Sequence, residues 1–165
     1  MKKYLVLILF VILFSCRSKK PVTNPNNSNT NIENPIPYKR FVITTKNEVE
    51  PEKLKKAIEL GKRLLETCNT SRFKSFNSSE ATQTVIENAT SEKISKTCQK
   101  INFRNGKFLD LILLDITHDI ETNDYIFRFD IKYVKTFYQR ELKIVMNKDN
   151  KVSSIVSKEV TKKPF

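Results

Sequence analysis

Few side chains in this sequence could carry out covalent or acid–base chemistry, since the chain has only three cysteines and one histidine. The histidine, His118, is followed by Asp119 and lies near Glu121, and a His–Asp pair could act as a general base. The pair occupies a polar stretch at the end of an expected strand, where a histidine is usually solvated. We therefore expect no catalytic site here, and the sequence does not predict an enzyme.

Carboxylates and metal-binding residues also fail to form a catalytic pattern. Asp110 and Asp115 interrupt one apolar run, but their odd spacing should place them on opposite faces of a strand. One histidine and two separated cysteines do not fit the ligand spacing of a zinc site. The sequence has no glycine-rich phosphate loop and no G-x-S-x-G motif. No metal and no cofactor are therefore predicted.

Cys68 and Cys98 are a candidate disulfide pair. In an oxidising compartment, two such cysteines can bridge. The bridge would close a loop of about thirty residues and would contribute about 3 to 4 kcal/mol in the chain-entropy model. The alternative is two buried free thiols that pack as small apolar groups. Sequence supplies no distance between the two residues, so both possibilities stay open.

The first residues have the pattern of an export signal. Lys2 and Lys3 precede an uncharged apolar run at residues 4–14. The run has about eleven residues, well short of the roughly twenty that a membrane-spanning helix needs. A positive start followed by a short apolar run is typical of a signal peptide. The alternative, a buried N-terminal helix, would show polar residues on one face, and this run shows none.

The end of the run, Leu13-Phe14-Ser15-Cys16, resembles the lipobox of bacterial lipoproteins, with an aliphatic residue, then a small residue, then the cysteine. The resemblance implies that a lipid is attached to the Cys16 thiol and that residues 1–15 are removed. Acyl chains, palmitate among them, would anchor the protein because each buried methylene contributes about 0.8 kcal/mol. The alternative is ordinary secretion with an unmodified Cys16.

The residues after Cys16 bear on which membrane is expected. Arg17, Lys19 and Lys20 suit contact with anionic head groups. In the lipoprotein family, an Asp after the cysteine typically retains the protein in the inner membrane. Arg17 stands there instead, which favours the outer membrane. No acidic stretch that resembles a surface-export tag follows, which favours the side that faces the periplasm.

The formal net charge of the 165-residue chain is +12. A basic protein could bind nucleic acid, but export would separate it from that partner, so nucleic-acid binding is not predicted. An anionic envelope polymer, anionic lipid or an acidic envelope protein fits better. The alternative is a lysine-rich surface that only keeps the domain soluble.

Composition divides the chain into a signal peptide at 1–15, a lipidated cysteine and tether at 16–37, and a single domain at 38–165. The tether is rich in Pro, Asn, Ser and Thr and has almost nothing to bury. Such a segment is predicted to be disordered, and its prolines keep it extended. Its expected role is to hold the domain away from the bilayer.

The domain is predicted to begin with a long helix, after a β-prone run at 41–44 that could form a lead-in strand. Pro51 suits the first turn of the helix, and apolar residues then recur at spacings of three and four as far as Cys68. Gly61 lies within this stripe. Its cost of about 1 kcal/mol relative to alanine predicts the close approach of another element.

Two weaker helices are expected next. Ser79 can cap a short helix that runs to about Asn88, and Thr90 or Ser91 can cap another. Gly106 should end that second helix, because the apolar periodicity changes after it from about 3.6 to 2.

Four strands are predicted after Gly106, at residues 108–117, 125–134, 142–146 and 152–160. The second alternates most clearly, with aromatic and aliphatic residues on one face and charged residues on the other, which predicts a sheet with one covered face. Residues 148–151 have turn chemistry between hairpin strands. Tyr125 or Tyr133 could line the rim of a small apolar pocket at one end.

Helices followed by an antiparallel meander indicate an α+β fold. The order resembles the cystatin-like, or NTF2-like, superfamily, and three short stretches carry the resemblance: 57–61 (AIELG), 105–108 (NGKF) and 147–152 (NKDNKV). The resemblance implies N-terminal helices packed on a curved four-stranded antiparallel sheet that forms a cone.

Two functions follow as hypotheses. The first is a membrane-anchored lipoprotein of the cell envelope with a non-enzymatic binding or accessory domain. The second is a small-ligand carrier or an enzyme that uses an NTF2-like internal pocket. The almost purely apolar list of inward-facing residues favours the first. A secreted inhibitor or toxin-neutralising protein is a third possibility.

Overall fold

In the described part of the chain, one short strand and all of the helices precede residue 106, and only strands follow it. The structure is a computed structural model that describes residues 39–160, so Cys16 and the other N-terminal features lie outside the described residues. The elements are β1 (Phe41–Thr44), the 3-10 helix η1 (Lys46–Glu48), α1 (Pro51–Thr70), α2 (Gln83–Asn88), α3 (Ser91–Asn105), β2 (Phe108–Asp119), β3 (Asp124–Tyr133), β4 (Gln139–Met146) and β5 (Val152–Val160).

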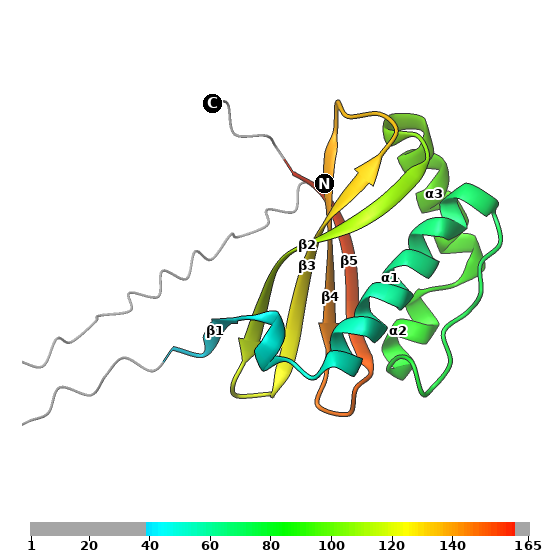
Figure 1. Cartoon of the computed structure of the whole chain (residues 1–165). Coiled ribbons are helices and arrows are strands. Elements are labelled where there is room, and N and C mark those ends of the chain that lie inside the picture. Colours follow the sequence, from blue (N-terminus) through cyan, green and yellow to red (C-terminus); the bar gives the residue numbers. More distant parts are fainter. Residues whose placement is uncertain (1–38, 161–165) are drawn as a thin grey trace, which may run out of the picture. The chain divides into compact units, whose positions relative to one another are not determined.

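The sheet has five antiparallel strands in the order β1-β2-β3-β4-β5, and Figure 1 shows the helices on one of its faces. The α+β class is therefore confirmed. The expected number of four strands is wrong because the β-prone run at 41–44 joins the sheet. Its residues pair with the last residues of β2, from Phe41 opposite Asp119 to Thr44 opposite Ile116.

Helix α1 begins where its sequence signal predicts. Pro51 occupies the first helical position, where its missing N–H costs nothing. Ser71 ends the helix in the left-handed conformation, with φ of 57°, and its N–H donates to the Thr67 carbonyl. Between them, the apolar stripe faces the sheet.

Gly61 is a point of close approach between α1 and the sheet. A Cβ at this position would lie 2.9 Å from Ile144 Cδ1, 3.0 Å from Leu142 Cδ2 and 3.1 Å from Leu111 Cδ1. The prediction that another element approaches Gly61 closely is therefore confirmed, and that element is the sheet, through β2 and β4.

The two shorter helices differ in how well their caps were predicted. Thr90 caps α3, and its Oγ1 accepts a hydrogen bond from the Lys93 N–H. The prediction that Ser79 caps α2 is wrong, because α2 starts after Thr82. Ser79 lies instead in a turn where its hydroxyl donates to Asn77 Oδ1 at 2.6 Å.

The core fills the layer between α1 and the sheet. The inward-facing residues predicted on β3 are buried there, with Tyr125 only half-buried at one end. Fully buried side chains from β2, β3, β4 and β5 complete the layer: Ile116, Phe127, Phe129, Leu142, Ile144, Met146 and Val152. Because these large side chains meet the stripe of α1, the space beneath the helix is occupied.

Candidate functional site

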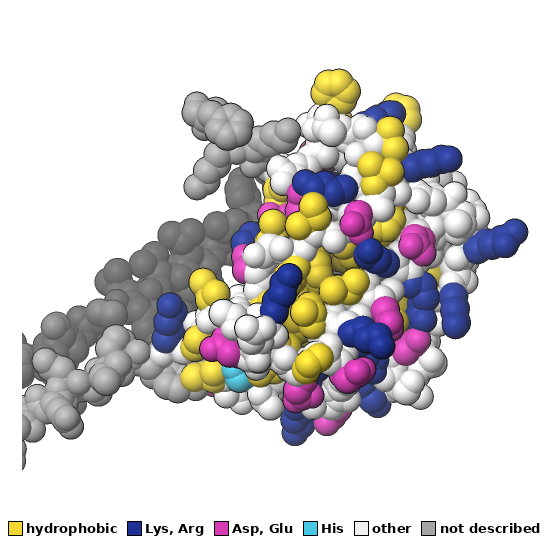
Figure 2. Space-filling view, viewed as in Figure 1, with side chains coloured by type: hydrophobic (Ala, Val, Ile, Leu, Met, Phe, Trp, Pro, Cys, Tyr) yellow, Lys and Arg dark blue, Asp and Glu magenta, His cyan; other side chains and the backbone are white. Residues whose placement is uncertain are grey.

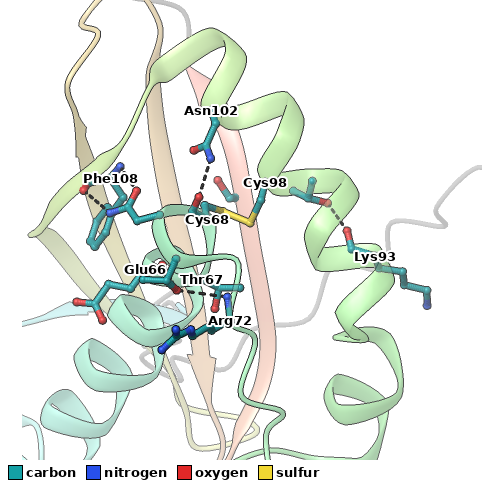
Figure 3. Close-up of a disulfide and its surroundings, with 12 residues drawn as sticks. Glu66, Thr67, Cys68, Arg72, Lys93, Cys98, Asn102 and Phe108 are labelled. Carbon is teal, nitrogen blue, oxygen red and sulfur yellow. Dashed lines mark hydrogen bonds between the residues drawn. A yellow bond between two sulfur atoms is a disulfide. The ribbon is translucent and has the colours of Figure 1, made fainter.

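Cys68 and Cys98 form a disulfide in the structure, with their Sγ atoms 2.10 Å apart and their Cα atoms 4.7 Å apart. Figure 3 shows that the bond joins the C-terminal end of α1 to the middle of α3. Both residues are buried. The bond fixes α3 against α1 and closes off the intervening segment that contains α2.

Polar side chains reinforce the same region. Asn102 Nδ2 donates to the Cys68 carbonyl at 2.6 Å, as Figure 3 shows. Asn69, near the end of α1, forms two hydrogen bonds with the backbone of Phe108, the first residue of β2. Its Oδ1 accepts from the Phe108 N–H, and its Nδ2 donates to the Phe108 carbonyl. The disulfide, α3 and the start of β2 are thus one tightly connected unit.

His118 and Asp119 are not brought together as a catalytic pair. His118 stacks on Tyr125 with ring centroids 4.4 Å apart, and its Nε2 lies 2.8 Å from Asn123 Oδ1. Asp119 instead accepts hydrogen bonds from Arg40, with Nη2 and Oδ2 2.7 Å apart. These hydrogen bonds hold the pKa of Asp119 at about 2, so this carboxylate stays ionised as an ion-pair partner.

A buried lysine beside Tyr125 was not predicted. Lys53 lies on the inner face of α1, and its Nζ is 3.0 Å from Glu50 Oε1 and 5.3 Å from the centre of the Tyr125 ring. The ammonium is thus shared between a carboxylate and an aromatic face. Sequence offered one signal for it, because position 53 lies four residues before Ala57 on the apolar stripe.

Asp110 and Asp115 form ion pairs with different basic side chains, so the two carboxylates do not form a pair with each other. Asp110 pairs with Lys62 of α1 at 2.7 Å, and hydrogen bonding to Lys62 lowers the pKa of Asp110. Asp115 pairs with Arg128. A bulge between Leu113 and Asp115 interrupts the strict alternation on which their placement was predicted.

The described residues form several shallow hollows. One of about 260 Å³ is lined largely by apolar residues from the three helices, from β5 and from the segment between α1 and α2, among them Leu64, Phe76 and Ile155. Another of about 190 Å³ lies beside Tyr133 in the β3–β4 hairpin. Within residues 39–160, no three His, Cys, Asp or Glu side chains lie together so that they could hold a metal ion.

Tyr133 points inward and its hydroxyl has no hydrogen-bond partner within the described part of the chain. Burial raises the pKa of Tyr133 to about 12, so the phenol stays neutral at physiological pH. Its hydroxyl is therefore a hydrogen-bond donor that lies beside the hollow of the β3–β4 hairpin.

The end of the domain at the β3–β4 loop exposes apolar side chains, and we call the set Phe103, Val134, Phe137 and Tyr138 the aromatic tip. Phe103 is 84% exposed and Phe137 is 86% exposed. In Figure 2, hydrophobic side chains project at this end, with Lys and Arg side chains around them. Sequence reasoning missed this surface because its residues come from segments about thirty positions apart.

The backbone beneath the aromatic tip is fixed by hydrogen bonds between the end of α3 and the β3–β4 loop. Asn105, which is fully buried, donates from Nδ2 to the Tyr138 carbonyl at 2.7 Å and accepts from the Lys135 N–H at its own carbonyl. Lys135 Nζ donates to the Phe103 carbonyl at 3.0 Å. The Arg104 guanidinium stacks 4.2 Å from the centre of the Tyr138 ring.

Comparison of the chain with protein-family models, with curated proteins and with solved structures found no match. A search of the described helices found none that is both long enough and apolar enough to cross a membrane.

Proposed function

We propose that the protein is a lipoprotein of the bacterial cell envelope that is anchored to the membrane by a lipid on Cys16. Its folded part would be a non-enzymatic binding or accessory domain. On this proposal it resides on the outer membrane and faces the periplasm. The observation that carries the binding role is how the domain uses its apolar residues. Its buried apolar residues form one core cluster beneath α1. Among the large apolar side chains that stay exposed, Phe103 and Phe137 of the aromatic tip are exposed the most.

The disulfide supports export of the domain. Disulfides form and persist in oxidising compartments and are rare in the cytosol. The Cys68–Cys98 bond therefore agrees with the reading of residues 1–15 as an export signal. The lipobox-like Leu13-Phe14-Ser15-Cys16 then supplies the anchor, and a few acyl chains hold a protein on a bilayer stably.

The layered arrangement supports the likeness to the NTF2-like or cystatin-like superfamily. A long first helix lies across one face of an antiparallel meander (Figure 1). We propose that the domain belongs to that architectural class and that its cone is filled rather than hollow, because Gly61 lets α1 approach β4 within van der Waals contact.

Metabolic labelling with a fatty-acid analogue tests the anchor. The wild-type chain should incorporate the label and sediment with membranes, whereas Cys16→Ala should lose the label and be released, because the acylated thiol is missing. Ser18→Ala is the matched control and should behave as the wild type. Undiminished labelling in Cys16→Ala would refute the anchor.

A small-ligand carrier is the second candidate, and the apolar hollow of about 260 Å³ favours it. Its volume is just below the usual range of ligand pockets, about 300 to 1,000 Å³. Titration with a fluorescent apolar probe distinguishes the two functions. A carrier should bind the probe and should lose it when Ala89→Leu fills the hollow, whereas a binding module with a filled interior should bind no probe in either form.

A further inference from the structure

The aromatic tip exposes large apolar side chains to water, which is energetically unfavourable. Phe103 and Phe137 are almost fully exposed, although burying such a side chain gains about 1.5 to 3 kcal/mol. Single exposed apolar residues are ordinary, but here four of them are carried by two segments, the end of α3 and the β3–β4 loop, that hydrogen bonds join to each other. The arrangement is typical of a contact surface.

The charge around the aromatic tip is positive. Lys100, Lys107 and Lys135 are exposed near it, and Arg104 stacks on Tyr138. Lys100 and Lys107 form no ion pair within residues 39–160. The acidic neighbours are already engaged, since Glu159 pairs with Arg104 and Asp130 with Lys132. The surface therefore complements an anionic partner.

The shape of the tip favours a bilayer over a protein partner. Phe103 and Phe137 are almost fully exposed, and neither lines the hollow of the β3–β4 hairpin or the one beside β5. A projecting ring needs a matching pocket on a protein, whereas the interface of a bilayer admits aromatic side chains without one. Apolar side chains flanked by lysine and arginine are the combination that binds anionic membrane surfaces.

The geometry of the chain allows the tip to reach the membrane. The chain enters the sheet at β1, which pairs with the end of β2 that is remote from the tip. The distance along β2 is about 30 Å at 3.3 Å per residue. Residues 16–38 can span up to about 70 Å, so an anchor at Cys16 leaves the domain free to turn its tip toward the same bilayer.

We propose that the aromatic tip inserts into the interface of an anionic phospholipid bilayer and so orients the domain on the membrane. This inference rests on the proposed function insofar as the anchor keeps a bilayer within reach. The lysines bring the tip to the anionic head groups, and Phe103 and Phe137 enter the boundary with the acyl chains.

A single tryptophan reports insertion, because the chain has no tryptophan of its own. Full-length Phe137→Trp would be incorporated into vesicles that contain anionic phospholipid and lipids brominated on their acyl chains. We expect a blue-shifted emission and strong quenching by the brominated lipid. Full-length Ile43→Trp is the matched control, since Ile43 is also exposed but lies in β1, which pairs with the end of β2 remote from the tip. The emission of this variant should change little when vesicles are added.

The lysines provide a second arm. Adding Lys100→Gln and Lys107→Gln to the Phe137→Trp variant should lower the equilibrium constant for insertion about 30-fold. Each lysine near an anionic surface contributes about 1 kcal/mol to binding. Vesicles of zwitterionic lipid should reduce quenching in the same way. Circular dichroism should remain that of the wild type, because all of these positions are exposed.

Three outcomes would overturn the proposal. Absence of quenching at position 137, or equal quenching at positions 137 and 43, would show that the tip does not insert. A blue shift that needs no vesicle and grows with protein concentration would identify a second copy of the chain as the partner. Failure of the anchor can be distinguished from failure of tip insertion. The anchor is measured by lipid labelling at Cys16, and its loss would leave the difference in quenching between positions 137 and 43 intact.

Discussion

The Arg63–Glu80 pair is the best-formed ion pair between α1 and the turn that precedes α2. Both guanidinium Nη atoms donate to the carboxylate, at 2.7 and 2.8 Å, and the Asn77 N–H donates to it as well. Hydrogen bonding to Arg63 lowers the pKa of Glu80 from 4.5 to about 2. The pair is mostly buried, so it is screened less than a surface pair.

We expect Glu80→Gln to lower the free energy of unfolding at pH 7 by about 1.5 to 3 kcal/mol, the range for hydrogen bonds to charged groups. Because the folded-state pKa of Glu80 is depressed, the stability it contributes is complete above about pH 4.5 and is lost as pH falls toward 2. The difference between wild type and variant should therefore shrink across that window. Urea unfolding at a series of pH values measures it.

Glu92→Gln is the matched control, because Glu92 forms an exposed pair with Lys96 on α3. Such a pair is worth at most about 0.5 kcal/mol, so its loss should have little effect at any pH. A Glu80→Gln effect as small as that of Glu92→Gln, or one that does not change with pH, would contradict the role assigned to the Arg63–Glu80 pair.

Single residues also show where sequence reasoning stops. Gly61 was interpretable because glycine is costly inside a helix, and only a close neighbour explains it. His118 and Asp119 were adjacent in sequence, yet Arg40, almost eighty residues away, takes the carboxylate. A partner so distant in sequence leaves no local pattern, so its effect on the pKa of Asp119 could not be predicted.

At the scale of elements, the disulfide is a covalent connection between two of the helices. It joins α1 to α3 across a sequence separation of 30 residues. In the chain-entropy model, a loop of this length contributes about 3 to 4 kcal/mol by restricting the unfolded chain. The bond also holds α3 in the position from which its end supports the aromatic tip.

We expect Cys68→Ala/Cys98→Ala to reduce the free energy of unfolding by about 3 to 4 kcal/mol. Removing both cysteines avoids an unpaired thiol. Reductant should destabilise the wild type by a similar amount and should leave the double variant unchanged, which separates loss of the bond from general effects of the reagent. Alkylation of two free thiols in the native protein, without reductant, would contradict the bond.

Element prediction succeeded where periodicity was long and failed where it was short. The stripe of α1 and the alternation of β3 extend over enough residues to determine element type and inward face. The four-residue β1 was predicted only as a lead-in, because it becomes a strand by pairing with β2. The bulges of β2 likewise depend on the partner strand, so its alternation could not be followed residue by residue.

At the scale of the whole molecule, the fold could be predicted more fully than the candidate site. Order of elements and apolar pattern were sufficient for an α+β meander covered by helices. The aromatic tip was not predictable, since Phe103 follows an α3 pattern and Phe137 a loop pattern, and neither indicates that they meet. Hydrogen bonds between Asn105 and the β3–β4 loop join the two segments that carry these residues.

The core of the domain lies between Val49 and Val152, and this predicts which part of the chain folds independently. A chain that begins at Tyr38 should unfold at the same urea concentration as one that begins at Cys16, within about 0.5 kcal/mol in free energy. A chain that begins at Thr45 should unfold earlier. It lacks β1 and the ion pairs of Arg40 with Asp119 and Glu121, at 2.7 and 2.8 Å.

Circular dichroism during urea titration compares the three chains, and the Thr45 chain serves as the destabilised reference. If the Tyr38 chain were as unstable as the Thr45 chain, residues 16–37 would have to contribute contacts to the fold, and their role as a tether would be refuted. Equal stability of the Tyr38 and Cys16 chains would leave those residues free to set only the distance between anchor and domain. That freedom is what the aromatic tip requires in order to turn toward the bilayer.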